Sequence, residues 1–327
     1  MLFYKFFIFL FFPIVVFSDK NTLRLVQFNT QWLFTEYNHI IDCPGKGCIW
    51  KNKKESDIHF LFISKILNEL RADIINLCEV QGMHEMKQLV ETTNKNYYSY
   101  LVNGTDKETY QNNGLLTLLK PSILPYRINT EYQYPIENTN CHYNGSTILT
   151  DIPKHFITEF KIDSFLVTLI SLHLPAIPQN PAQCAAREAQ AQIIQNDIQT
   201  HLKKGNEIIV IGDLNDFDNR VLDKDDNIPN SMVLDILKGN EGTFKKKFKL
   251  FTISEKIEKS ERHTESFDDN HSCRESMIDH ILVSPKLFYH VYNVSIYHKY
   301  IHNCSDKINW KGYFNSDHDP VIIDFKF

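Results

Sequence analysis

Short apolar segments typical of β-strands alternate with segments of helical periodicity along most of the chain, and this alternation constrains the fold most. Helices are expected at 57–70, where apolar residues recur at helical spacing, and at 182–202, a stretch rich in Ala and Gln. Strands are expected at 23–28, 73–78, 115–119, 155–160, 165–174, 207–211, 276–283 and 321–325.

The turn at 162–164 joins two of these strands as a hairpin, so antiparallel neighbours are expected beside parallel ones. Two mixed sheets packed together, with the helices outside, would bury this pattern. No repeat, low-complexity tract or flexible linker divides the chain, and 43% of its residues are hydrophobic. We therefore expect one α/β domain over 19–327.

Residues 1–18 have the composition of a secretory signal peptide. One basic residue, Lys5, precedes an apolar run over 6–17 that only Pro13 interrupts. This run is too short to span a bilayer, which takes about 20 residues. Cleavage is expected near Ser18, and a membrane anchor is the alternative interpretation of the same segment.

Four N-glycosylation sequons follow this segment and agree with export of the chain. Their acceptor residues are Asn103, Asn144, Asn293 and Asn303. We therefore predict a secreted protein, or one that resides in the lumen of the secretory pathway, with N-linked glycans.

The seven cysteines fit an oxidising compartment. Cys78 lies in an apolar strand and is expected to be a buried free thiol, whereas Cys43 and Cys48 are expected to pair across a small loop. Several pairings of the remaining cysteines are open, so these stay unassigned: Cys141, Cys184, Cys273 and Cys304. A zinc site is a weaker alternative, because the sequence contains no Cys-x-x-Cys pair.

The formal charge of the chain is −5 at pH 7. This value argues against a protein that holds nucleic acid by bulk positive charge. It is compatible with an enzyme that meets a phosphodiester at one site, where a metal ion supplies the positive charge.

Polar side chains stand at the ends of six predicted strands, where packing does not explain them. Each has an ordinary structural explanation when taken alone, such as a turn, a strand cap or a buried histidine. One shared site explains the whole series better than separate accidents do. The candidates are Asn29, Glu79, His173, Asp213, Asn215, Asp279, Asp317 and His318.

Six motifs that contain these residues resemble, in the same order, those of the endonuclease/exonuclease/phosphatase superfamily, which has the deoxyribonuclease I-like fold. They are FNTQWLF (28–34), INLCEVQ (75–81), SLHL (171–174), IGDLND (211–216), MIDHILVS (277–284) and SDHDP (316–320). GDLNDF and IDHILVS are most similar to secreted nucleases of the superfamily. The resemblance implies a four-layer α/β/β/α sandwich of two packed mixed sheets, with the site at one end of both.

The resemblance also implies a metal centre. Glu79 would hold a divalent cation, with Mg²⁺ expected and Mn²⁺ or Ca²⁺ as alternatives, because these ions prefer hard oxygen ligands. Asn29 would position the metal or the phosphate, and Asp317 would complete the cluster. One ion or two would suit the residues, so this number stays open.

The same resemblance implies that water, rather than a covalent nucleophile, attacks phosphorus. Asp213 and Asn215 would orient that water and the phosphoryl oxygens. His318 would bind the scissile phosphate or deprotonate the water, and Asp279 would fix its tautomer and stabilise its charge. His173 would bind the phosphate or protonate the leaving oxygen.

Other features carry predictions of their own. Arg187 is expected on the surface of the helix at 182–202, with substrate contact as the less usual alternative. Arg127 is a candidate for phosphate binding. The basic run at 245–249 is expected to be a solvated loop, with a nucleic-acid backbone as its alternative partner. Three roles are open for the Tyr- and His-rich stretch at 288–302: its side chains could stack on bases, contact lipid or simply pack.

We therefore expect a secreted, metal-dependent phosphodiesterase whose substrate is DNA or RNA. The alternative is the same chemistry on a phospholipid, as in sphingomyelinase-like relatives, or on a small phosphoester such as an inositol phosphate. The inositol branch is disfavoured, because no Pro-Ala-Trp-Cys-Asp-Arg type of signature precedes the strand of Asp279. A catalytically silent binding module is a further alternative, and the sequence implies no stable protein partner.

Overall fold

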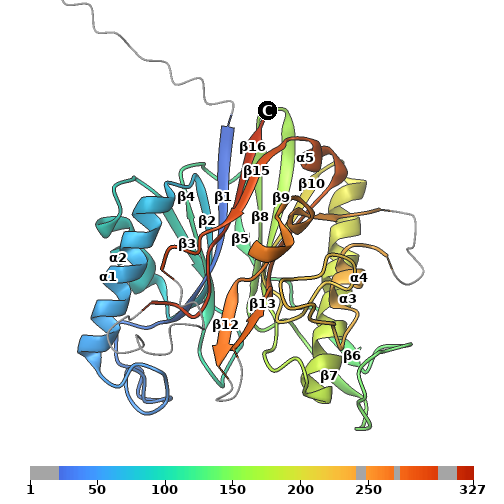
Figure 1. Ribbon diagram of the computed structural model, residues 1–327, viewed down its shortest axis with the longest axis horizontal. Coiled ribbons are helices and arrows are strands. Elements are labelled where there is room, and N and C mark those ends of the chain that lie inside the picture. Colours follow the sequence, from blue (N-terminus) through green and yellow to red (C-terminus); the bar gives the residue numbers. More distant parts are fainter. Residues whose placement is uncertain (1–21, 241–247, 269–272, 301–314) are drawn as a thin grey trace, which may run out of the picture.

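The computed structural model describes residues 22–240, 248–268, 273–300 and 315–327. Two six-stranded sheets lie face to face, and helices cover their outer faces, so the layers follow the order α/β/β/α (Figure 1). This confirms the predicted four-layer sandwich. The predicted signal peptide and the sequon at Asn303 lie outside the described residues. Within them, no helix is both long and apolar enough to cross a membrane.

The first sheet has the strand order β15-β16-β1-β2-β4-β3, in which β1 and β2 are parallel and the other neighbours are antiparallel. Its outer face is covered by the two helices α1 (Lys53–Leu70) and α2 (Met83–Thr92). The strands are β1 (Thr22–Leu33), β2 (Ile74–Val80), β3 (Tyr98–Val102), β4 (Asn112–Thr117), β15 (Val291–Ile296) and β16 (Val321–Lys326).

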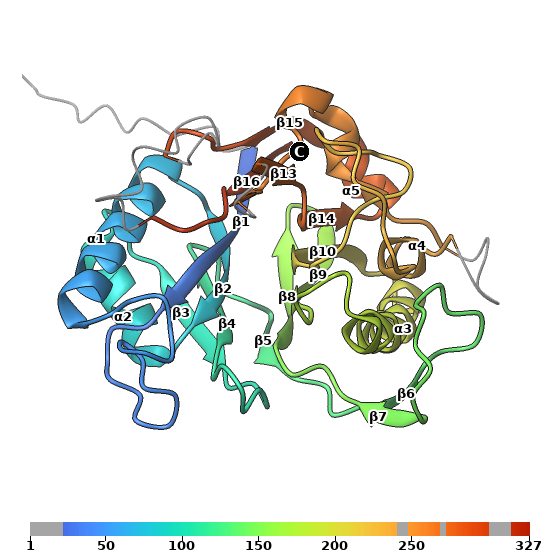
Figure 2. The same ribbon diagram turned by 60° about the horizontal axis from the view of Figure 1, so that its bottom comes forward.

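The second sheet has the order β11-β14-β10-β9-β8-β5, in which only β9 and β10 are parallel. The helices α3 (Pro181–Lys203) and α4 (Val233–Leu237) cover its outer face, opposite α1 and α2 (Figure 2). The strands are β5 (Ile123–Tyr126), β8 (His155–Ile162), β9 (Phe165–His173), β10 (Glu207–Asp213), β11 (Phe251–Thr252) and β14 (Asp279–Val283).

Two small hairpins and three short helices complete the described part of the chain. The hairpin of β12 and β13 extends beyond one end of the sandwich (Figure 1). These elements are β6 (Tyr132–Tyr134), β7 (Ile148–Thr150), β12 (Glu265–Asp268), β13 (Cys273–Ser276), α5 (Pro285–Tyr289) and the 3₁₀ helices η2 (Ile253–Lys256) and η3 (Lys259–Glu261).

The two-residue period of the strands divides their side chains between two cores. On β1, Leu23 and Leu25 belong to the core between the sheets, whereas Val26 and Phe28 pack beneath the helices. On β10, residues 209 and 211 face the inner core, and residues 208 and 210 face α3. Continuing each inner row by this period reaches polar residues at the strand ends, and these rows lead to the candidate site.

Most predicted elements are present with small shifts of their ends. The exception is the strand predicted at 276–283, which is interrupted after Ser276 and resumes at Asp279. The backbone N–H of Met277 donates to the Asp223 carboxylate, and that of Ile278 donates to the Thr264 hydroxyl. Side chains therefore take the donors that a continuous strand would have paired.

Two disulfides cross-link the described residues. Cys43–Cys48 confirms the predicted small loop, and Cys141–Cys184 ties the segment between β6 and β7 to α3. Cys78 is a buried free thiol, as expected. Cys304 and the side chain of Cys273 lie outside the described part.

Candidate active site

The inner rows of both sheets end in polar side chains at the same end of the sandwich. Asn29 stands on β1 and Glu79 on the neighbouring strand β2. In the second sheet, Asp213 lies opposite His173 of β9 and opposite Asp279 of β14. Strand register therefore fixes these three residues side by side, because neighbouring strands lie about 4.8 Å apart.

Asn29 joins the two halves of the site. Its side-chain Nδ2 donates to Glu79 Oε1 at 3.1 Å and to Asp213 Oδ2 at 2.9 Å, across the gap between the sheets. Its Oδ1 accepts a hydrogen bond from the backbone N–H of Gln31 at 3.0 Å. In this arrangement the Asn29 amide group bridges two carboxylates, and its oxygen accepts a hydrogen bond from the backbone of Gln31.

Glu79 and Asp317 are the two carboxylates that the sequence predicts as metal ligands. Glu79 is held by Trp32 N–H and Gln111 Nε2, which donate to its Oε2 at 3.0 and 2.7 Å. Asp317 Oδ1 is buried and has no hydrogen-bond partner among the described residues. Its burial, together with the charges of Glu79 and Glu265, raises the pKa of Asp317 to about 7. A divalent cation would satisfy this orphan oxygen and neutralise the crowded charge, so the donor set fits such an ion.

His318 is oriented by a carboxylate on the neighbouring sheet. Its Nδ1 lies 2.7 Å from Asp279 Oδ2, and Gln27 Nε2 donates to the other oxygen of Asp279 at 3.0 Å. Burial disfavours the charged ring, but the nearby carboxylates, led by Asp279, raise the pKa of His318 well above its ordinary value. The Nε2 atom of His318 lies 3.9 Å from Asp213 Oδ2 and 3.8 Å from Asp317 Oδ1, so it faces the centre of the site.

His173 differs from His318 in its electrostatic surroundings. Its Nε2 lies 3.7 Å from Asp213 Oδ2 and 3.9 Å from Glu79 Oε1. Burial, with smaller contributions from Lys154 and His318, lowers the pKa of His173 well below its ordinary value. Burial and the charge of Asp279 raise the pKa of Asp213. The site therefore contains one histidine that favours the neutral form and one that favours the charged form.

The backbone around the site adopts conformations that are costly for ordinary residues. Glu79 has φ 66° and Asn215 has φ 50°, both in the left-handed region. Asn215 is held by its N–H donating to Asp213 Oδ1 at 2.9 Å and by its Nδ2 donating to Leu174 O at 3.0 Å. Such strained positions are typical of functional sites, where the surrounding contacts enforce them.

A cavity of about 660 Å³ opens beside the site. Glu79 and His173 form part of its wall, together with Trp32, Gln111 and Lys154. Lys154 is largely buried, and its ammonium group donates to Gln111 Oε1 at 3.2 Å and lies 3.7 Å from Asp106 Oδ2, which also lines the cavity. The cavity thus presents a cation, an aromatic ring and the catalytic candidates to one bound molecule.

The surface position predicted for Arg187 is wrong. Its side chain is completely buried on α3, 3.5 Å from Asp216, because α3 packs this face against the sheet. The guanidinium donates to the carbonyls of Pro175 and Pro178 at 3.0 and 3.2 Å. Arg187 therefore holds the loop after β9, which contributes to the cavity wall, and has no surface with which to contact substrate.

Arg127, a candidate for phosphate binding, instead donates hydrogen bonds to loop backbone, and its side chain is largely buried. It donates to Ile152 O at 2.9 Å and to Asn103 O at 3.2 Å. In the stretch predicted to stack, pack or bind lipid, Tyr297 and Tyr300 bond to Glu69 of α1, which favours packing for this part. Residues 245–247 of the basic run and residues 301–302 lie outside the described residues.

Three residues of the site were not predicted from the sequence, namely Gln27, Gln111 and Lys154. Gln27 lies two residues before Asn29 on the same face of β1, so strand periodicity offered a signal. Gln111 and Lys154 lie immediately before β4 and β8, where no periodic pattern marks their direction.

A family model described as the endonuclease/exonuclease/phosphatase family matches residues 27–306. No curated protein matches the chain. Among solved structures, a family member from Bacteroides thetaiotaomicron is similar at 18% identity and a TM-score of 0.53, over 93% of this chain and 94% of its own.

Two further solved structures share the fold. The mannosyl-6-phosphatase of Bacteroides thetaiotaomicron VPI-5482 has 17% identity and a TM-score of 0.53, over 93% of this chain and all (100%) of its own. TDP2 from C. elegans has 14% identity and a TM-score of 0.53, over 94% of this chain and 75% of its own. Because the family model spans most of the chain, the chain belongs to the endonuclease/exonuclease/phosphatase family, whose members hydrolyse phosphoester bonds.

Proposed function

We propose that this chain is a secreted, divalent-metal-dependent phosphodiesterase that hydrolyses nucleic acid as an endonuclease. The observation that carries the proposal is the charged His318–Asp279 pair, 2.7 Å apart, beside the orphan carboxylate oxygen of Asp317. This combination would bring a proton-transfer group and a cation site to one point, which supports the proposal. A phosphodiester needs both, because negative charge builds on its oxygens in the transition state.

Glu79 and Asp317 would hold the ion, with Mg²⁺ expected because both donors are hard oxygens. When bound, the cation supplies positive charge to the phosphoryl oxygens. Asn29 keeps Glu79 and Asp213 at fixed positions through its two hydrogen bonds. These contacts exist in the protein before any ligand arrives, so less reorganisation is needed during the reaction.

We assign the proton transfers and the hydrogen bonds to the phosphate to residues on its two sides. Asn215 and Asp213 orient the attacking water, and Asp213, whose pKa is raised, accepts the proton that this water loses. His318 donates a hydrogen bond to the phosphoryl group from Nε2, while Asp279 stabilises its charge through Nδ1. His173, the neutral ring, binds the phosphate or the leaving oxygen. General acid–base catalysis of this kind contributes about 10²–10⁴-fold to the rate.

The cavity favours a nucleic-acid substrate over a small phosphoester. Its volume of about 660 Å³ accommodates more than one phosphate group, and Trp32 and Lys154 line it. An aromatic ring can stack on a base, and an ammonium group can pair with a flanking phosphate.

Export is supported by the two disulfides and by three sequons. Asn103, Asn144 and Asn293 are all exposed, so an oligosaccharide could be attached to each without unfolding the chain. We propose that these three positions are glycosylated and that the protein is released into an extracellular or vesicular lumen.

The test is hydrolysis of plasmid DNA and of RNA by the purified glycoprotein, with Mg²⁺, Mn²⁺ or Ca²⁺ and then with EDTA. We expect cleavage that requires the ion and that falls by about 10²–10⁴-fold in His318→Ala. His39→Ala, which changes an exposed histidine that is not among the candidate site residues, serves as the matched control and should behave as the native protein.

A parallel panel separates the alternatives. Turnover of sphingomyelin, of inositol phosphates or of mannose 6-phosphate without nucleic-acid cleavage would transfer the same chemistry to that substrate. Nucleic acid and all these phosphoesters left intact under every divalent ion would favour the catalytically silent module and end the nuclease proposal.

A further inference from the structure

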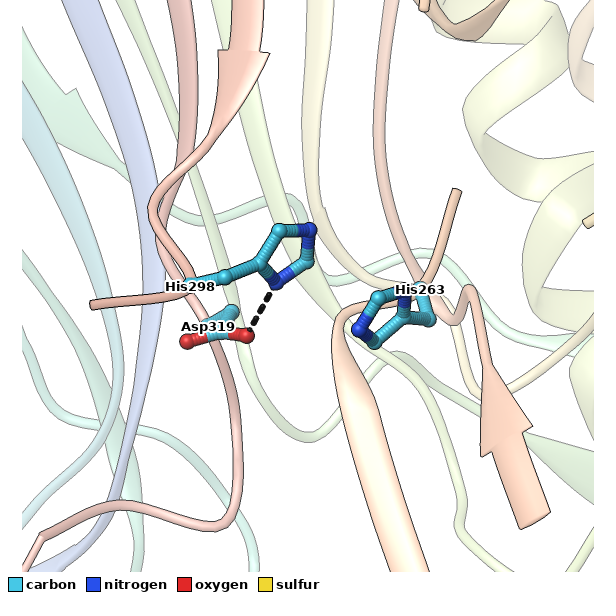
Figure 3. Close-up of side chains that lie close together, drawn as sticks. All are labelled: His263, His298 and Asp319. Carbon is cyan, nitrogen blue, oxygen red and sulfur yellow. Dashed lines mark hydrogen bonds and ion pairs between the residues drawn. The ribbon is translucent and has the colours of Figure 1, made fainter. Parts of the chain in front are cut away.

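Three side chains outside the catalytic centre lie close enough to share one ligand. His263, His298 and Asp319 each offer an atom within 4.8 Å of the other two (Figure 3). They come from separate segments, since His263 follows η3, His298 follows β15 and Asp319 lies two residues before the start of β16. Their two imidazole rings are stacked, with centroids 4.1 Å apart and an angle of 11° between the planes.

The hydrogen bonds of His298 indicate which nitrogen could bind a metal ion. Its Nε2 lies 3.2 Å from the backbone oxygen of Glu261, which can only accept, so Nε2 carries a proton. Its Nδ1 lies 2.6 Å from Asp319 Oδ2, as the dashed line in Figure 3 marks. At this distance a proton lies between the two atoms, and a metal ion bound to both would take the place of that proton.

His263 shows the same division between its two nitrogens. Its Nε2 faces Glu275 Oε1 at 3.7 Å, whereas its Nδ1 is buried and has no hydrogen-bond partner in the described part of the chain. The side chain is only 8% exposed, so water does not compensate this orphan atom. Burial and the nearby His298 lower the pKa of His263 to about 4, which keeps the ring neutral and its lone pair available at neutral pH.

We propose that His263, His298 and Asp319 form a second metal site, which binds Zn²⁺ or a chemically similar transition-metal ion. Two imidazoles and one carboxylate are ligands typical of zinc, with water in the fourth position of the tetrahedron, and the ion would displace the proton that His298 Nδ1 shares with Asp319. This set differs from the oxygen donors of the catalytic centre, which suit Mg²⁺.

The outer contacts of the two histidines match those of metal ligands. A ligating histidine usually donates its second N–H to a carboxylate or a backbone carbonyl, which fixes the ring and its tautomer. The Glu261 carbonyl occupies this position for His298, and the Glu275 carboxylate faces His263 Nε2 at 3.7 Å, beyond hydrogen-bond distance. Zinc binding would draw the three ligand atoms together and rotate the stacked rings, because Zn–N bonds are about 2.0–2.1 Å long.

The proposed site would clamp the segment that carries the catalytic histidine. Asp319 follows His318 directly, and its N–H donates to Thr264 O at 2.7 Å. Thr264 follows His263, and its hydroxyl accepts from the backbone N–H of Asp279 at 3.1 Å. One ion would therefore tie together the segments on both sides of the His318–Asp279 pair.

Cobalt binding tests the site without any substrate. The protein is stripped with a chelator, supplied with excess Mg²⁺ to occupy the oxygen-donor centre, and titrated with Co²⁺. We expect one equivalent of Co²⁺ with the visible absorption of a tetrahedral complex, followed by loss of this absorption when Zn²⁺ displaces it. Zn²⁺ should also raise the melting temperature, because it binds the folded state.

Matched variants assign the ion to its ligands. His263→Ala and His298→Ala should lose the cobalt absorption and the zinc-dependent rise in melting temperature, whereas Glu79→Gln and His39→Ala should keep both. Glu275→Gln retains all three ligands and tests their orientation, with an expected loss of about 10–100-fold in zinc affinity. Native affinity in both histidine variants, or loss of the cobalt signal in Glu79→Gln alone, would overturn the proposal.

Discussion

Gln27 and Asp279 belong to different sheets, yet a 3.0 Å hydrogen bond joins their side chains inside the sandwich. Gln27 is completely buried, and its own oxygen accepts from Asn76 Nδ2 at 2.6 Å. The bond occupies the Asp279 oxygen that His318 does not use. A buried amide on β1 thus completes the hydrogen bonding of the Asp279 carboxylate, which orients the proposed catalytic residue His318.

Replacing this amide with a thioether of similar shape should damage both stability and activity. Gln27→Met leaves Asn76 and one Asp279 oxygen without a partner, so the free energy of unfolding should fall by about 1–3 kcal/mol. Urea denaturation and kcat of the same samples measure the two effects. Gln133→Met, on an exposed face of β6, is the control, and an equal loss there would contradict the assignment.

Removing the charge of Glu79 should weaken the metal centre while preserving its shape. Glu79→Gln retains an oxygen for the hydrogen bond from Trp32 N–H, so the fold should persist. We expect the Mg²⁺ concentration for half-maximal activity to rise at least about tenfold, the equivalent of roughly 1.4 kcal/mol. A magnesium titration of activity measures this shift, and an unchanged midpoint would remove Glu79 from the metal centre.

Lys154 should contribute to substrate binding through its position in the cavity wall. Lys154→Met removes the ammonium charge but keeps the aliphatic stem, so kcat/KM should fall about tenfold, roughly 1.4 kcal/mol. Most of this loss should be in KM and should shrink as ionic strength rises. Steady-state kinetics at two salt concentrations measure it, with Lys161→Met on the exposed side of β8 as the control.

Glu69 should make stability depend on pH below the neutral range. Hydrogen bonds from Lys299 and Tyr297 lower the pKa of Glu69 to about 2, from an ordinary value of 4.5. A lowered folded-state pKa stabilises the protein fully above the unfolded value, and this contribution disappears as the pH falls toward about 2.

Glu69→Gln should therefore reduce the free energy of unfolding by about 1 kcal/mol at neutral pH, as for a partly exposed ion pair. The difference from the native protein should narrow between about pH 5 and pH 3. Urea denaturation across this range measures it, and Glu91→Gln on the exposed face of α2 should show no such trend. A difference that stays constant with pH would contradict the assignment.

Gly212 should not tolerate a side chain. It lies on β10 directly before Asp213 with φ 151°, and an added Cβ would come within 1.8 Å of Leu172 O on β9. Gly212→Ala should lower the free energy of unfolding by at least about 1–3 kcal/mol, because the backbone must move.

Gly205→Ala is the matched control for this change. Gly205 also has a positive φ of 89°, but nothing lies within 4 Å of its added Cβ, so only the conformational cost of about 1–2 kcal/mol applies. Equal losses in the two variants would show that the close approach to Leu172 does not matter.

Periodicity and strand-end chemistry predicted most of the fold from the sequence. The inner row of β10 passes from Ile209 and Ile211 to Asp213, and this change from apolar to polar marks the strand end and the site together. The helix α2 and the strand β3 were not predicted, because only three residues of α2 are buried and none of β3 is.

Long-range contacts account for what the sequence could not predict at the site. Arg187 lies in a polar pattern on α3, but its guanidinium finds carbonyl partners on the loop after β9. His298 and His263 are distant in the sequence and meet only because β15 and the segment after η3 converge. No local pattern encodes such a meeting.

The bridge that Asn29 makes to Glu79 and Asp213 places half of the reaction centre on each sheet. The thickness of the apolar core between the sheets therefore sets the distance between the proposed ion-holding residues on one sheet and the proton-transferring residues on the other. Core substitutions far from the site that change the side-chain volume between the sheets would change kcat, although every polar residue of the site stays in place. In this protein, the thickness of the hydrophobic core would set the distance between the proposed ion-holding and proton-transferring residues.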